Sequence, residues 1–185
     1  ENVGSVAVGQ FLRNIDISEI KGTVIAIPVV NTSGYEFQQR QVVWDGKDLN
    51  RQGAGDPDGT AAQRLAFAYF DEVVARADGF IDMHSGTPVG LVYYTFYEAH
   101  LEGKIPEVIE RSKDMGLAFG LADVFSETPW PGTFEEVALL HDIPSISVEI
   151  GGGSDWRYRG QEFIDLCERG IRNVMVLIGM LEGKI

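Results

Sequence analysis

Residues 60–86 decide the fold class, and they read TAAQRLAFAYFDEVVARADGFIDMHSG. Thr60 is a suitable helix N-cap, and apolar residues recur after it at helical spacing as far as Ala77. Asp78-Gly79 ends this pattern, and residues 80–84 form a short apolar run that predicts a strand. A helix of this length followed directly by a buried strand is the unit from which α/β sheets are built.

Helix patterns and strand patterns alternate in the same way before and after residues 60–86. The strand runs are dense in β-branched and aromatic residues, which is typical of buried strands in parallel sheets. We therefore expect one α/β domain over residues 1–185, in three layers, with helices flanking a mostly parallel (mixed) central sheet. Its ligands should lie at the carboxyl ends of the strands. Helices are predicted over residues 3–15, 106–119, 134–141 and 161–181, and strands over residues 23–30, 91–97, 123–126 and 145–150.

Length, composition and charge bound the function classes. The 185 residues are 44% hydrophobic and can bury one core, in which the single cysteine, Cys167, is expected as a small buried hydrophobe. A net charge of -13 argues against nucleic acid and anionic membranes as partners. No apolar run approaches the roughly 18 residues of a membrane span, and residues 1–4 show no signal-peptide pattern. With one cysteine, we expect a cytoplasmic protein.

Residues 31–59 form a long polar segment without periodicity. A structureless loop of this length is unusual in a compact domain and is typically functional. It contains Arg40, Asn50 and Arg51. Guanidinium groups in a cleft suit recognition of a substrate carboxylate or polarisation of a carbonyl oxygen, whereas solvated loop arginines are the plainer alternative.

His84 ends a predicted strand and precedes the flexible pair Ser85-Gly86. It is either a metal ligand or a hydrogen-bonded structural histidine. Asp82 lies on the same face of the strand and could orient the imidazole, although an Asp in a salt bridge would give the same pattern.

Glu149 stands in an otherwise apolar strand that three glycines follow. A buried carboxylate is costly unless it is paired or bound to a metal, so this placement requires a reason. A general base and a metal ligand are the functional hypotheses, and an ion pair with Arg157 or Arg159 is the structural alternative.

These motifs together resemble those of the succinylglutamate desuccinylase/aspartoacylase family, which is related to the zinc carboxypeptidases. The similarity is most specific to the branch that deacylates small N-acyl amino acids such as N-acetyl-diaminobutyrate. The resemblance therefore implies a zinc carboxypeptidase-like fold. The matching stretches cover nearly the whole chain in the family's order and comprise residues 31–40, 45–51, 55–60, 77–86 and 144–152.

The resemblance also implies roles for individual residues. His84 and Glu1 would be zinc ligands, and Glu149 would be the general base that activates the attacking water. Arg40 would polarise the scissile carbonyl, while Asn50 and Arg51 would hold the substrate carboxylate.

The family's third zinc ligand is a histidine three positions before the glutamate that Glu1 matches, and this sequence does not contain it. His100 and His141 read better as a surface residue and a helix-end residue than as replacements. The chain also stops where the family normally continues into a small β-rich domain. We therefore expect residues 1–185 to be the catalytic core of a longer protein, lacking an N-terminal segment and that C-terminal domain.

The leading hypothesis is a zinc-dependent amidohydrolase that removes a small acyl group from an N-acyl amino acid. The alternatives are a metallocarboxypeptidase, which would use the same residues on peptides, and a non-catalytic carboxylate-binding module that has lost its metal. A homo-oligomer is compatible with the sequence, which fixes neither the acyl group nor the amino acid.

Overall fold

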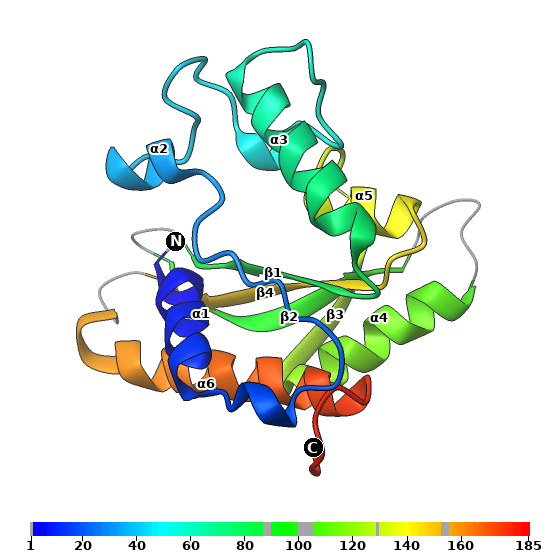
Figure 1. The fold of residues 1–185 in the computed structure, drawn as a ribbon. Helices are drawn as coiled ribbons and strands as arrows, with labels where there is room; N and C mark the ends of the chain where they lie inside the picture. Colours follow the sequence, from blue (N-terminus) through cyan, green and yellow to red (C-terminus); the bar gives the residue numbers. More distant parts are fainter. Residues whose placement is uncertain (1, 87–89, 100–105, 129, 153–155) are drawn as a thin grey trace.

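The computed structural model of the protein has a central sheet between two layers of helices (Figure 1). It describes residues 2–86, 90–99, 106–128, 130–152 and 156–185, with the backbone alone for residues 156–158. The described helices are α1 (Val3–Asn14), α2 (Thr32–Glu36), α3 (Ala61–Glu72), α4 (Pro106–Phe119), α5 (Phe134–Leu140) and α6 (Trp156–Leu177). The strands are β1 (Phe80–His84), β2 (Val92–Glu98), β3 (Asp123–Glu127) and β4 (Ser145–Gly151).

The sheet has the strand order β1-β4-β2-β3. β1 is parallel to β4, and β2 is parallel to β3, but β2 and β4 are antiparallel. The central sheet is therefore mixed, as expected, with parallel pairing in two of its three contacts. The pairing of β1 with β4 sets His84 opposite Glu149 at the carboxyl ends of both strands.

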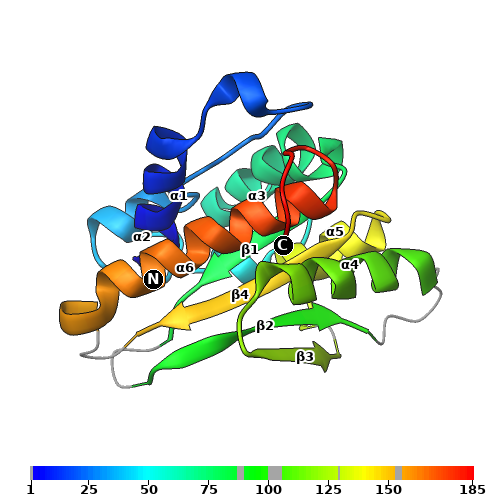
Figure 2. The ribbon, with the colours of Figure 1, turned by 90° about the horizontal axis from the view of Figure 1, so that it is seen from below.

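The two faces of the sheet are covered differently. Figure 2 shows α1, α6 and α4 over one face, while α3 and α5 lie on the other. Side chains alternate along a strand, so Ile146, Val148 and Ile150 of β4 enter the core beneath α1 and α6. Phe80 of β1 instead joins the core formed with α3 and α5. Glu149 alternates with these residues of β4, so it belongs to the α3/α5 face. Asp82 and His84 lie on the same side of β1 as Phe80 and therefore belong to that face too.

Most elements predicted from periodicity are confirmed within a few residues. Thr60 is the N-cap of α3, and its backbone N–H donates to Oε1 of Gln63 at 3.0 Å. The last helix begins earlier than expected, and the loop at residues 31–59 contains α2 and a 3₁₀ turn at Leu49–Arg51. Cys167 is fully buried, and burial raises the pKa of its thiol to about 12. No helix among the described residues is long and apolar enough to cross a membrane.

The strand predicted over residues 23–30 was wrong. This segment is irregular, and Ile25 and Ile27 are 54% and 38% exposed. Its β-branched composition is that of a strand, but a strand needs a hydrogen-bonded neighbour, and β1 pairs only with β4 in the described sheet.

Candidate active site

The loop at residues 31–59 meets the carboxyl ends of β1 and β4, where His84 and Glu149 lie. A cleft of about 1490 Å³ runs along β1 to this point, and its lining includes Arg40, Asn50, Asp82, His84 and Glu149. The fold thus brings five of the seven candidate residues together in one concave site. Such clefts at strand ends are where α/β sheets bind ligands.

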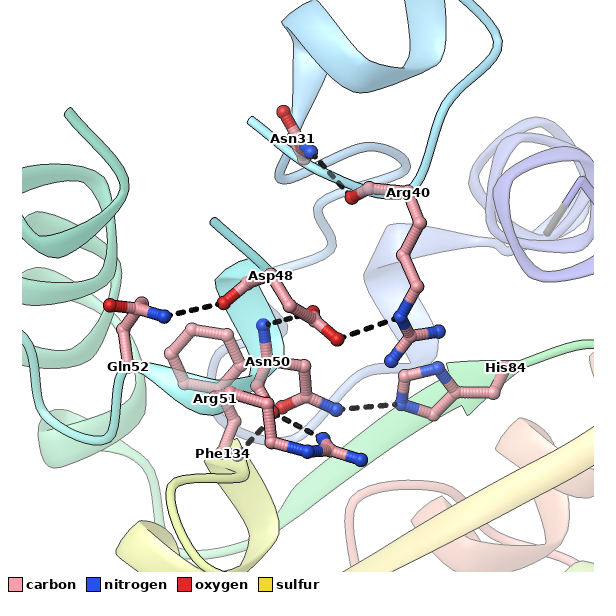
Figure 3. Close-up of polar contacts among 8 residues, drawn as sticks. All are labelled: Asn31, Arg40, Asp48, Asn50, Arg51, Gln52, His84 and Phe134. Carbon is pink, nitrogen blue, oxygen red and sulfur yellow. Dashed lines mark hydrogen bonds and ion pairs between the residues drawn. The ribbon is translucent and has the colours of Figure 1, made fainter. Parts of the chain in front are cut away.

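Arg40 is held at the mouth of the site by two neighbours. The amide of Asn31 donates to the backbone carbonyl of Arg40 at 3.1 Å, and its own oxygen accepts from the N–H of Gly34 at 2.9 Å. Nε of Arg40 donates to Oδ2 of Asp48 at 2.8 Å. Figure 3 shows the guanidinium extending from the loop toward His84.

Asn50 connects the loop to both the sheet and α5. Its Oδ1 accepts the N–H of Phe134, the first residue of α5, at 2.9 Å, while its Nδ2 lies 3.3 Å from Nε2 of His84 (Figure 3). Asp48 fixes the same turn, because its Oδ1 accepts the backbone N–H of Asn50 at 3.0 Å. The amide of Asn50 is therefore oriented by α5, with its NH₂ group toward the imidazole.

The imidazole of His84 is surrounded by polar groups on its Nε2 side. Oδ2 of Asp82 lies 3.1 Å from Nε2, and Oε1 of Glu135 lies 3.9 Å away. The His84 side chain is 13% exposed and that of Glu135 only 4%. Oδ2 of Asp82 is thus within hydrogen-bonding distance of the ring.

Glu135 is the site residue that the sequence did not reveal. It lies in the first turn of α5, over the α3/α5 face of the sheet, and its Oε2 has no hydrogen-bond partner among the described residues. Burial, followed by the charge of Asp82, raises its pKa well above the usual range for a carboxyl group. Asp82, His84 and Glu135 offer ligand atoms that all lie within 4.8 Å of one another, so they could hold a cation. Two adjacent acidic residues, Glu135 and Glu136, are typical of the exposed first turn of a helix, so the local sequence does not indicate that Glu135 is buried.

Glu149 lies on β4 beside both neighbouring strands. It is half-buried, and its register partners are His84 on β1 and Tyr94 on β2. Burial, and then the charge of Glu149, raises the pKa of Tyr94. A carboxylate here faces the cleft next to the imidazole, as a general base would have to.

The remaining candidates do not join this group. Arg51 is exposed and absent from the cleft lining; its Nη1 donates to the carbonyl of Asn50, and its guanidinium lies 5.8 Å from the ring centre of Trp130. Arg159 bonds Glu162 through two nitrogens, at 2.9 and 2.7 Å. His141 caps α5, as predicted for a helix-end residue. The expectations for Glu1, for His100 and for the side chain of Arg157 fall outside the described residues.

A comparison with models of known protein families identifies the family of this chain. The model of the succinylglutamate desuccinylase/aspartoacylase catalytic domain matches residues 1–178. The chain belongs to this family. A relative in Halomonas elongata, N-alpha-acetyl-L-2,4-diaminobutyric acid deacetylase, is 26% identical over 188 residues, which is 100% of this chain and 53% of the relative. This chain therefore spans about half the length of that family member.

Solved structures of the family share this fold. The succinylglutamate desuccinylase/aspartoacylase of Rhodobacter sphaeroides superposes with a TM-score of 0.86 at 30% identity, over 100% of this chain and 54% of its own. A candidate metallopeptidase from Shewanella amazonensis superposes with a TM-score of 0.67 at 14% identity, over 97% of this chain and 72% of its own. The second likeness concerns the fold alone, and it confirms the metallopeptidase-like architecture that the family resemblance implied.

Proposed function

We propose that this chain carries the core of the active site of a zinc-dependent deacylase, which hydrolyses the amide bond of a small N-acyl amino acid. The observation that supports this most directly is the convergence of Arg40, Asn50, His84 and Glu149 on one cleft. Membership of the family and the deacetylase relative favour the same reaction class.

The donor set around His84 fits zinc, which binds imidazole nitrogen and carboxylate oxygen. With a proton on Nε2, the ring donates to Asp82 at 3.1 Å, and Nδ1 keeps the lone pair that a metal needs. His84 and Glu1 would hold the ion, and Asp82 would orient the ring. When bound, zinc supplies Lewis-acid polarisation and makes water more acidic.

Glu135 offers a second arrangement, in which the ion lies between Nε2 of His84, Asp82 and Glu135. Asp82 and His84 line the cleft but Glu135 does not, so we propose that His84 and Glu1 would hold the ion and that Glu135 would not. We therefore expect Glu135→Gln to retain zinc and His84→Ala to lose it, as measured by metal analysis of the full gene product. Loss of zinc in Glu135→Gln would identify Glu135 as a ligand instead.

The other residues divide the remaining work of amide hydrolysis. Glu149 would take a proton from the attacking water and deliver it to the leaving amine. The guanidinium of Arg40, held by Asp48, would stabilise the negative charge that develops on the carbonyl oxygen. Because Nε2 of His84 carries the proton in this arrangement, Nδ2 of Asn50 donates nothing to it and can offer both of its hydrogens to a substrate carboxylate. Arg51 would hold the substrate carboxylate only after its guanidinium had moved away from the ring of Trp130.

The test is an assay of amine release by the full gene product with N-acetyl-L-2,4-diaminobutyrate, other N-acyl amino acids and unacylated dipeptides. We expect turnover of N-acyl amino acids, and a loss of about 100-fold or more in kcat for Glu149→Gln with zinc retained. Glu36→Gln, at the exposed end of α2, is the matched control. Unchanged turnover in Glu149→Gln would refute its role. Cleavage of dipeptides alone would indicate a carboxypeptidase, and carboxylate binding without turnover a binding module.

A further inference from the structure

The cleft has a further wall at the start of β2, beside the catalytic residues. Val92 and Tyr94 line it, and because they are two positions apart, their side chains lie on the same face of β2. Tyr94 is the register partner of Glu149, so this face continues the one that carries the proposed general base. We call the part of the cleft lined by Gly86, Gly90, Val92, Tyr94 and Glu149 the β2 subsite. The roles proposed above use only Glu149 among these residues.

Packing limits the extent of the β2 subsite on two sides. The ring of Tyr94 meets the ring of Phe125 edge to face, with centroids 5.4 Å apart, so it is held against β3. At Gly86, an added Cβ would collide with the carbonyl oxygen of Gly90 and would lie 3.0 Å from Cγ2 of Val92. The subsite is therefore bounded by an aromatic ring on one side and by close-packed backbone on the other.

The charge of the β2 subsite is negative, because Glu149 is its acidic member and it has no basic one. Burial, followed by the charges of Glu149 and Glu127, raises the pKa of Tyr94, so its phenol is neutral and lies near two carboxylates. The basic side chains that line the described cleft come from the loop before β1, from the turn after α3 and from the end of β1: Arg40, Arg76 and His84. A carboxylate that entered the β2 subsite would be repelled by Glu149.

The order of the strands sets the direction in which a substrate would lie. Asn50 faces His84 on β1 (Figure 3), Glu149 follows on β4, and Tyr94 follows on β2. An amide is planar and trans, so its two substituents lie at opposite ends. With the carboxylate at Asn50 and the scissile carbonyl between His84 and Glu149, the acyl group extends toward β2. An acetyl group would end near Glu149, whereas a succinyl group would extend roughly one strand spacing of about 4.8 Å further, over Tyr94.

We propose that the β2 subsite receives the acyl group, and that Tyr94 makes it selective for short uncharged acyl groups such as acetyl over those that end in a carboxylate, such as succinyl. The ring of Tyr94 closes the subsite to longer chains, and Glu149, ionised as the base, repels a second carboxylate. The assignment rests on the proposed deacylase function and adds a specificity-determining residue to it. Family membership does not decide this point, because the family includes desuccinylases.

A comparison of acyl groups on one amino acid tests the proposal with the full gene product. The measurement is kcat/KM for the N-acetyl and N-succinyl derivatives of whichever amino acid is released fastest, and we expect acetyl to be preferred about tenfold or more. Tyr94→Lys places an ammonium group in the subsite and should reduce this preference by about tenfold or more. Trp44→Lys adds the same charge at an aromatic residue that is 74% exposed and outside the cleft lining, so it should change the preference by less than about twofold.

Tyr94→Ala keeps the test decisive if the lysine variant does not fold. It removes the ring without adding a charge, so kcat/KM for an N-hexanoyl substrate should rise about tenfold or more relative to N-acetyl. Trp44→Ala should leave that ratio unaltered. Equal rates with acetyl and succinyl in the wild type, or equal effects of the Tyr94 and Trp44 variants, would overturn the acyl subsite alone. Absence of turnover with every N-acyl amino acid would instead refute the deacylase function, and the subsite with it.

Discussion

Glu98, the last residue of β2, gives the protein a stability that depends on pH. Its side chain is 3% exposed, and its carboxyl group bonds the backbone of Trp130 and the hydroxyl of Thr133, yet Oε2 has no partner among the described residues. Burial, and then the negative charge of Glu136, raises the pKa of Glu98 from 4.5 to about 7. The folded protein therefore keeps a proton at Glu98 at a pH where the unfolded chain has released it.

The sign of the effect follows from this proton. Between pH 4.5 and about 7 the folded state binds more protons at Glu98 than the unfolded state does, so the free energy of unfolding falls as the pH rises. One pKa unit is worth about 1.4 kcal/mol, which makes the full loss about 3 kcal/mol. Glu98→Gln keeps the size of the side chain and removes the titration. The variant should therefore match the wild type at about pH 4 and exceed its stability by about 3 kcal/mol above about pH 8.

Urea denaturation followed by circular dichroism, repeated across this pH range, measures the difference directly. Glu36→Gln is the control, because Glu36 lies exposed at the end of α2 and its loss should shift stability little at any pH. A difference between Glu98→Gln and wild type that is constant with pH would refute the argument. It would mean that the substitution changes packing and that no buried proton is involved.

Three further substitutions test how the loop at residues 31–59 is held. Asn50→Ala removes the acceptor for the N–H of Phe134 at the start of α5, so we expect urea denaturation to show a loss of about 1–2 kcal/mol, and an unchanged midpoint would contradict this contact. Gly55 has a φ of +76°, and a Cβ there would collide with backbone atoms of Gln63 and Phe67 in α3; Gly55→Ala should cost about 4 kcal/mol or more. Gly46→Ala, at a φ of +69° with nothing within 4 Å, should cost only the backbone strain of about 1–2 kcal/mol, and equal losses would show that the collision is relieved.

The pattern of residues along the chain was sufficient to predict those elements whose formation does not depend on the element they pair with. The helix at Ala61–Glu72 and the strand at Phe80–His84 follow from their own periodicity and from the Thr60 cap and Gly79 break. The strand at residues 145–150 was likewise predicted from its own composition, and Ile146, Val148 and Ile150 all enter one core. These features depend only on spacing along the chain.

Pairing and burial across the chain could not be predicted in this way. Residues 23–30 have the composition of a strand, but composition does not show whether a partner edge is present, and β2 gave no signal that it runs antiparallel to β4. Glu135 and Glu136 are adjacent and chemically alike, yet only Glu135 is buried against the sheet. The difference between them arises from the orientation of α5, which no local pattern records.

The stretch from Asp48 to Arg51 shows why catalytic and structural roles are difficult to separate in this protein. Asp48 binds both the side chain of Arg40 and the backbone of Asn50, and Asn50 in turn accepts the N–H of Phe134 at the start of α5 and faces His84. Loss of the Asp48 side chain would release Arg40 and the turn at Asn50, and loss of the Asn50 side chain would release contacts to α5 and β1. Consequently, a fall in kcat alone cannot assign Asp48 or Asn50 to substrate binding. An Asn50 variant that keeps the bond to Phe134, compared in KM and in stability with Asn50→Ala, is needed to divide its contribution between the substrate and the fold.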